Sequence, residues 1–237
     1  MSVAENIATI QERIAVAARK SGRDPASISL MAVSKTQSVE RIREAYAAGL
    51  RIFGENRVQE FAGKVDALKD LPDAEFHMIG HLQTNKAAKA AELFGAVDTV
   101  DSLKLAEKLN SAARALNKKL DVLIEINVGG EAAKSGVSSG SPALEELLAS
   151  APRLQGLVFR GLMTVPPFTE DPGGARPYFR KLRELRDAIS ARKFPALTMD
   201  QLSMGMSHDF ELAIEEGSTC VRIGTAIFGA RPEAKKS

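Results

Sequence analysis

The chain has 237 residues, 44% of them hydrophobic and 26% charged, which is typical of soluble globular proteins and excludes fibrous and disordered classes. Lysine and arginine number 32 against 30 aspartates and glutamates, and the two signs are interleaved, so no nucleic-acid-binding surface is indicated. The length permits one large core, because α/β barrels of roughly 200 to 250 residues are commonly a single domain.

Cysteine usage and hydropathy indicate the compartment. Cys220 is the only cysteine, which excludes an internal disulfide and a cysteine-cluster metal site and suits a reducing cytoplasm. No apolar run approaches the ~18 residues that a membrane span needs, and the first residues lack a basic segment followed by an apolar one. We therefore expect a cytoplasmic protein with no membrane partner.

The first predicted element is an amphipathic helix over Ser2–Lys20. Ser2 and Glu5 have the spacing of a capping box. The apolar side chains fall on one helical stripe, made by Val3, Ile7, Ile10, Ile14 and Ala17. A cluster of helix breakers, Ser21–Pro25, follows this helix, which we expect to pack on the rest of the chain.

After Pro25, short apolar runs alternate with segments of helical periodicity. The predicted strands are Leu30–Ser34, Arg51–Gly54, Phe76–Gly80, Ala96–Val100, Val122–Val128, Leu157–Val165, Leu197–Ser203 and Cys220–Phe228. The predicted helices are Val39–Ala48, Asn85–Phe94, Leu103–Leu116, Pro142–Ser150, Arg176–Arg192 and Phe210–Glu216. This alternation predicts parallel βαβ units and a (β/α)8 TIM barrel with an additional N-terminal helix, the alternative being an open doubly wound sheet. Since no linker divides the chain, we expect a single domain over residues 1–237.

In such a barrel the chemistry lies at the C-terminal ends of the strands. The residues at or just beyond those ends are Lys35, Asn56, His81, Asn127, Met163, Ser203–Ser207 and Gly224–Thr225. No metal site is predicted, because the three histidines have no carboxylate or cysteine at ligand spacing.

Lys35 follows the first predicted strand. Strand alternation puts Met31, Val33 and Lys35 on one face, so a lysine amine stands at the barrel mouth if that face points inward. A partly desolvated lysine loses some preference for its charged form, and the neutral amine attacks aldehydes. The alternative is a solvated lysine at a strand end.

The last predicted strand suggests a phosphate site. Arg222 and Gly224 share a strand face, and Gly224 leaves room for a ligand to approach the backbone. Thr225 offers a hydroxyl, and Ser203–Ser207 precedes a helix whose first amides favour an anion. Phosphates commonly bind at the loops after strands seven and eight of such barrels. Ordinary loop glycines and a surface ion pair of Arg222 are the alternatives.

Five sequence blocks together resemble one known family, the pyridoxal 5′-phosphate (PLP) homeostasis proteins, which are single-domain relatives of the alanine racemase N-terminal barrel. The blocks are Ala32–Thr36, Phe53–Glu60, His77–Lys86, Leu202–Ser207 and Val221–Gly229. They are long and occur in order along nearly the whole chain. The resemblance implies that PLP is the cofactor and that the protein stores it reversibly.

The same resemblance implies a role for each predicted site residue. Lys35 would carry PLP as a Schiff base, the covalent aldimine, and Arg222 would face the pyridine nitrogen. The phosphate would be held by Ser207, Gly224 and Thr225, while Asn56 and Ser203 would line the same pocket. His208 departs from the acidic or small residue expected there in many relatives.

Arg222 bears on whether this protein is an enzyme. Arginine only donates hydrogen bonds and keeps its proton, so Arg222 would leave the pyridine nitrogen unprotonated and the ring a weak electron sink. Alanine racemases, by the resemblance, compensate with two bases, one a tyrosine of a second domain. The chain ends soon after Gly224, and Tyr46 and Tyr178 fall in predicted helices, so we expect that second base to be lacking.

Three functions follow from these observations. The favoured one is a monomeric, non-catalytic PLP carrier, with PLP-dependent apoenzymes as recipients of the cofactor. The alternative is a PLP-dependent enzyme similar to an amino-acid racemase. A third is an interaction protein in which PLP only signals occupancy. Turnover of amino acids by the PLP-loaded protein would separate the second function from the others.

Overall fold

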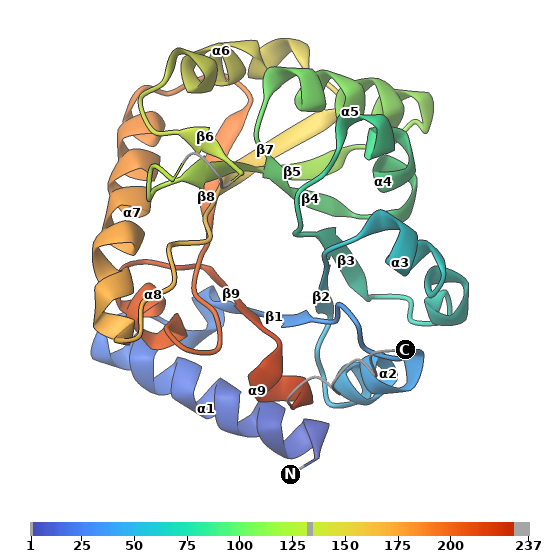
Figure 1. Ribbon diagram of the computed structural model, residues 1–237, viewed down its shortest axis with the longest axis vertical. Helices are drawn as coiled ribbons and strands as arrows, with labels where there is room; N and C mark the ends of the chain where they lie inside the picture. Colours follow the sequence, from blue (N-terminus) through green and yellow to red (C-terminus); the bar gives the residue numbers. More distant parts are fainter. Residues whose placement is uncertain (1, 132–134, 230–237) are drawn as a thin grey trace.

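The computed structural model describes residues 2–131 and 135–229, and it confirms the predicted barrel (Figure 1). The strands are β1 (Ser29–Val33), β2 (Ile52–Glu55), β3 (Glu75–Met78), β4 (Ala96–Val100), β5 (Leu120–Asn127), β6 (Val137–Ser138), β7 (Leu157–Met163), β8 (Leu197–Ser203) and β9 (Cys220–Ile223). All their pairings are parallel. The order β4-β3-β2-β1-β9-β8-β7-β5 closes into a ring because β4 also pairs with β5, and β6 is added beside β5.

Helices surround this ring (Figure 1). They are α1 (Val3–Lys20), α2 (Val39–Ala47), α3 (Val58–Ala62), α4 (Ala87–Leu93), α5 (Leu103–Ala115), α6 (Pro142–Ser150), α7 (Arg176–Ala191), α8 (Phe210–Glu215) and α9 (Thr225–Phe228). In the part of the chain that the structure describes, none of them is both long enough and apolar enough to cross a membrane.

The additional helix α1 forms as predicted. Ser2 and Glu5 make the reciprocal hydrogen bonds of a capping box. The predicted apolar stripe is buried, and α1 packs on α2, α8 and α9. Asn6 Nδ2 also donates to the carbonyl of Ile227 at 2.8 Å. The stripe therefore covers the outside of the barrel where β1 and β9 meet.

Strand alternation separates two cores, as β5 illustrates. Val122, Ile124 and Ile126 belong to the large apolar cluster between the ring and its helices. Leu123 is buried apart from that cluster, and Glu125, two residues further on the same strand face, is 5% exposed. The inside of the ring is thus partly polar, which is unusual for a barrel interior filled by branched apolar residues.

The last predicted strand, Cys220–Phe228, is wrong in its second half. β9 ends at Ile223, and α9 begins at Thr225 with Gly224 as its N-cap residue. The amides of Ile227 and Phe228 both donate to the Gly224 carbonyl, and their apolar side chains are buried. A short apolar run cannot be assigned to strand or buried helix by periodicity alone.

Smaller departures concern short elements. The described chain also contains α3 and β6, which the sequence analysis did not predict. α4 begins at Ala87 rather than Asn85, because residues Thr84–Lys86 form a turn of 3₁₀-helix. α3 is shorter than the window over which helical periodicity is recognised, and the two residues of β6 are too few to show strand alternation.

Candidate functional site

Lys35 lies in a turn directly after β1, at the C-terminal end of the barrel. Thr36 has a φ of +63°, which is strained for a β-branched residue. Its amide donates to Glu60 Oε1 at 2.6 Å, and Ser34 Oγ donates to Glu55 Oε1 at 2.7 Å. The residues on both sides of Lys35 are therefore held by carboxylates from β2 and α3.

Lys64 joins these two carboxylates. Its Nζ lies 2.7 Å from Glu60 Oε1 and 3.4 Å from Glu55 Oε1. Burial raises the pKa of Glu55, and Lys64 and Ser34 partly offset that shift. Burial also opposes ionisation of Glu60, but the hydrogen bonds from Lys64 and Thr36 lower its pKa overall. This charged network is half-buried and fixes the turn that carries Lys35.

Arg222 is a buried cation beneath this turn. It is 4% exposed and pairs across the β1–β9 ladder with Met31. Its Nη1 donates to Ser203 Oγ at 2.6 Å and its Nη2 to the Thr164 carbonyl at 2.7 Å. These bonds connect β9 with β8 and with the residue that follows β7, so the guanidinium is held in one orientation.

The Ser203–Ser207 loop after β8 is tightly packed. Gly205 has a φ of +96°, and a Cβ there would lie 2.6 Å from Ala213 Cβ, so only glycine fits. The Met206 amide donates to Asp209 Oδ1 at 2.7 Å, and burial raises the pKa of that carboxyl. The loop that carries Ser207 is therefore shaped by its contacts with the start of α8.

The Gly224–Thr225 turn lies beside the end of β1. The β1–β9 register aligns Ala32 with Ile223, which brings Gly224 next to Val33. A Cβ on Gly224 would lie 3.4 Å from Val33 Cβ, in van der Waals contact, so this turn packs against β1. Thr225 is exposed at the start of α9.

A cavity of about 630 Å³ opens at the same end of the barrel. Its lining residues are Asn56, Ile79, Gly80, His81, Glu125, Ile126, Asn127, Ser135 and Val165. Glu125 Oε1 accepts a hydrogen bond from Ser135 Oγ at 2.8 Å, whereas Glu125 Oε2 is buried and has no hydrogen-bond partner in the described chain. We call this space the mouth cavity.

Comparison with known proteins shows the family of this chain. The family described as "Alanine racemase, N-terminal domain" matches residues 6–232. The pyridoxal phosphate homeostasis protein of Aquifex aeolicus is 48% identical over 231 residues, which are 98% of this chain and 99% of that protein. The chain belongs to the pyridoxal phosphate homeostasis protein family. Its sequence resemblance to that family is thereby confirmed.

Solved structures agree with this family membership. PipY of Synechococcus elongatus, determined with PLP bound, superposes with a TM-score of 0.81 at 37% identity, over 96% of this chain and 100% of PipY. The alanine racemase of Streptomyces coelicolor superposes with a TM-score of 0.71 at 22% identity, over 98% of this chain and 60% of the racemase. The racemase shares the fold, and a similarity at this level of identity shows the fold alone.

This member of the PLP homeostasis protein family gathers most of its predicted site residues. Lys35, Gly224 and Thr225 follow neighbouring strands, and Arg222 is hydrogen-bonded to Ser203 below them. Ser207 lies in the loop after β8. Asn56 stands apart from this group, after β2, where it lines the mouth cavity. Their contacts with a cofactor stay a prediction.

Sequence reasoning missed several residues of this family member's site. Glu60 and Lys64 give no signal of their own, because their role depends on the fold bringing α3 beside the end of β1. Glu125 could have been noticed, since it is a lone acid in an apolar run and shares a strand face with Leu123.

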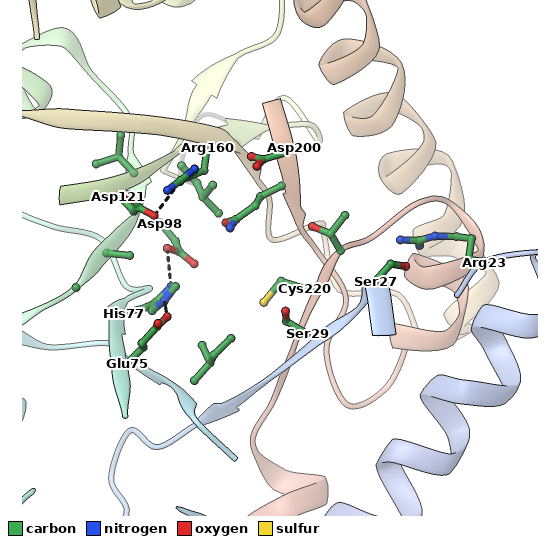
Figure 2. A pocket seen from close by; sticks show the side chains of 17 residues that line it. Arg23, Ser27, Ser29, Glu75, His77, Asp98, Asp121, Arg160, Asp200 and Cys220 are labelled. Carbon is green, nitrogen blue, oxygen red and sulfur yellow. Dashed lines mark hydrogen bonds and ion pairs between the residues drawn. The ribbon is translucent and has the colours of Figure 1, made fainter. Parts of the chain in front are cut away.

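A second cavity of about 590 Å³ lies at the opposite, N-terminal end of the strands (Figure 2). His77 Nδ1 lies 3.1 Å from Asp98 Oδ1, and Arg160 Nε donates to Asp121 Oδ2 at 2.8 Å. Burial lowers the pKa of His77, but Asp98 and Glu75 together outweigh burial and raise it to about 10. Burial raises the pKa of Cys220 to about 12, which makes its thiol unreactive.

This second cavity is not the predicted site. Among residues 2–131 and 135–229, no three His, Cys, Asp or Glu side chains are grouped to hold a metal ion. Catalytic and ligand sites of such barrels lie at the C-terminal end, and polar residues at the N-terminal end usually serve stability. We therefore assign the His77–Asp98 and Arg160–Asp121 pairs a structural role.

Proposed function

We propose that this chain binds PLP at the C-terminal end of the barrel and serves PLP homeostasis as a reversible carrier. The observation that carries the proposal is the β1–β9 register, which aligns Met31 with Arg222. It brings the Lys35 turn beside the Gly224–Thr225 turn, with a fixed guanidinium below both. Membership of the PLP homeostasis protein family and the PLP-bound structure of PipY support the same conclusion.

The residues present fit the chemical groups of PLP. Its phosphate needs hydrogen-bond donors and close backbone approach, which the Gly224–Thr225 turn and Ser207 offer where that turn packs against Val33. Its pyridine nitrogen needs a donor in a dry environment, and Arg222 is a buried guanidinium with its orientation fixed. Ser203 holds that orientation, and Asn56 borders the site from the mouth cavity.

Lys35 supplies the covalent attachment in this proposal. PLP supplies an aldehyde that combines reversibly with a primary amine, and the neutral lysine amine is the nucleophile. Lys35 is half-buried and its turn is fixed by Glu60 and Lys64, so the amine is held near one position without being sealed from solvent. Solvent access allows the cofactor to leave as well as to bind.

A carrier role, rather than an enzymatic one, follows from Arg222. A guanidinium that donates only would keep the ring nitrogen unprotonated and leave the ring a weak electron sink. Tyr46 lies in α2 bonded to Asp73, and Tyr178 lies in α7 against the outer apolar core, so neither reaches the mouth cavity. A low-activity amino-acid racemase is the alternative, favoured only by the shared fold.

The setting of this function is also proposed. We propose that residues 1–237 act as one domain and as a monomer in the cytoplasm, and that PLP-dependent apoenzymes receive the cofactor. The near absence of net charge agrees with partners that are neither nucleic acid nor membrane.

Borohydride reduction tests the covalent attachment. We expect the purified protein incubated with PLP to become yellow, and reduction to fix the mass of PLP on the peptide that contains Lys35. Lys35→Ala should lose this label, whereas the control Lys86→Ala, after β3, should keep it. A label that stays in Lys35→Ala would place the reactive amine elsewhere.

The same preparation separates carrier from enzyme. We expect no racemisation of L-alanine by the PLP-loaded protein, measured by chiral chromatography after a long incubation. Turnover near an ordinary enzyme's rate, on the order of 10 per second, would establish the racemase alternative instead.

A further inference from the structure

The mouth cavity contains a buried carboxylate oxygen that its protein surroundings do not satisfy. Glu125 is 5% exposed, and its Oε2 has no hydrogen-bond partner in the described chain. Buried polar atoms are nearly always hydrogen-bonded, because an unpaired one loses the hydrogen bonds that water would provide. Since Glu125 lines an open cavity rather than packed protein, a ligand in that cavity can supply the donor.

The other walls of the mouth cavity define what kind of donor fits. Ile79 and Val165 provide apolar side chains in its lining. Among the described lining residues there is no lysine or arginine, and His81 is 59% exposed and lies 3.4 Å from Asp101. A buried carboxylate beside apolar walls is complementary to a small organic cation.

The polar side chains of Asn127 and Ser135, near Glu125 Oε2, are already hydrogen-bonded to other groups. Asn127 donates to the Glu131 carbonyl at 2.8 Å and accepts from the Gly130 amide at 2.9 Å, so its side chain is directed to the loop after β5. Ser135 already donates to the other oxygen of Glu125. Glu125 Oε2 is thus the strongest acceptor that the mouth cavity offers to a ligand.

We propose that the mouth cavity is a binding subsite for a small primary amine, whose ammonium group donates to Glu125 Oε2 and whose carbon chain packs on Ile79 and Val165. Asn56 belongs both to this cavity and to the residues proposed for PLP, so the two sites adjoin. The inference does not require PLP to bind, because it depends on Glu125 and the cavity walls alone.

Binding of an amine should also change the protonation of Glu125. Burial raises the pKa of Glu125, the Ser135 hydrogen bond and the charges of Arg222 and His81 lower it, and Asp101 raises it. A bound ammonium favours the carboxylate, so its binding lowers this pKa and releases a proton over the pH range in which Glu125 titrates. Affinity should rise with pH across that range.

Calorimetric titration with propylammonium chloride tests the subsite in the full chain without added PLP. We expect saturable binding to the original protein, no binding of neutral 1-propanol, and at least about tenfold weaker propylammonium binding in Glu125→Gln. Glu55→Gln is the matched control, because Glu55 is also buried with an unpartnered Oε2 but does not line the mouth cavity. This control should bind propylammonium like the original chain.

Methyl NMR of the original protein tests the location without any substitution. We expect propylammonium to shift the signals of Ile79 and Val165 in a saturable manner. Equal propylammonium affinity in Glu125→Gln and the original chain would overturn the proposal, as would equal affinity for 1-propanol. A Glu125→Gln chain that loses PLP affinity but keeps propylammonium affinity would also overturn it, because Glu125 would then serve the cofactor.

Discussion

Arg222 illustrates how single residues define this site. A guanidinium that is 4% exposed must have acceptors for its donors, and it finds them in Ser203 Oγ and the Thr164 carbonyl. Ser203 ends β8, which is next to β9 in the ring, and Thr164 directly follows β7, the strand beyond β8, so the barrel itself orients the side chain. Lysine in the same position could not satisfy two acceptors with a planar fork.

Gly205 is the residue on which the loop after β8 most depends. In Gly205→Ala the new Cβ would meet Ala213 Cβ at 2.6 Å while the backbone stays at a φ of +96°. We expect a loss of unfolding free energy of about 2 to 4 kcal/mol, combining overpacking with left-handed strain. Urea denaturation measures it.

Gly22→Ala is the control for that substitution. Gly22 has a φ of +70° with nothing within 4 Å of the added Cβ. Only left-handed backbone strain then lowers the free energy of unfolding, by about 1 kcal/mol. Equal losses in the two variants would mean that the loop moves aside and is not held by α8.

At the scale of elements, the end of β1 is fixed by its neighbours more than by its own sequence. Thr36 adopts a φ of +63° because Glu60, from α3, accepts its amide hydrogen, and Lys64 holds Glu60 in place. The short helix α3 therefore acts on Lys35 without contacting a ligand.

Removing this support should affect PLP binding through the position of Lys35. In Glu60→Ala the Thr36 amide loses its acceptor and the turn can relax, so we expect about tenfold weaker PLP binding, the loss of one charge-assisted hydrogen bond. Titration of PLP followed by absorbance measures the affinity. Gln59→Ala, an exposed neighbour in α3, should bind PLP normally. Unchanged affinity in Glu60→Ala would show that Lys35 does not need this network.

Most elements of this barrel could be predicted from the sequence because their periodicity is long. β4 and β8 begin and end at the predicted residues, and α5 and α7 end within one residue of the prediction. The run Cys220–Phe228 was assigned to one strand because apolar composition does not distinguish β9 from α9. What decides there is packing, since Ile227 and Phe228 are buried beside α1.

At the scale of the whole molecule, the barrel carries charge at both ends of its interior. Arg222 and Glu125 lie toward the C-terminal end, and His77 with Asp98 lies toward the N-terminal end (Figure 2). Asp98 is 2% exposed, so its negative charge needs a partner within the barrel. Protonated His77 is that partner.

This pair makes stability depend on pH in the alkaline range. The pKa of His77 is about 10 in the folded protein against 6.5 in its ordinary state, so its contribution is complete below pH 6.5 and is lost as pH rises through 10. His77→Gln should cost about 3 kcal/mol at pH 6, as for one removed partner of a buried pair.

Urea denaturation of both proteins between pH 6 and pH 10.5 measures this dependence. The difference between the original chain and His77→Gln should shrink steadily with rising pH. Exposed His81→Gln is the control and should show no comparable dependence. A constant difference across the range would mean that His77 is neutral when folded.

The candidate site was predictable where it follows strand ends and unpredictable where it depends on contacts across the ring. Lys35, Arg222 and Gly224 are candidates from the sequence because parallel strands gather their C-terminal residues at one end, and their contacts with PLP stay a prediction. The hydrogen bond from the Thr36 amide to Glu60 and the unsatisfied Glu125 oxygen depend on which residues the fold brings together. Spacing along the chain does not reveal those neighbours.

The two hydrogen bonds of Arg222 have a consequence for the proposed role as a reversible carrier. Both acceptors are supplied by the barrel itself. Arg222 Nη1 and Nη2 therefore keep these hydrogen bonds when a ligand leaves. The empty binding site needs no rearrangement to stay folded, and the next ligand meets a site that is already preorganised. Binding and release of the ligand can then be set by the concentrations of free ligand and recipient protein, as in a buffer, and need no conformational cycle.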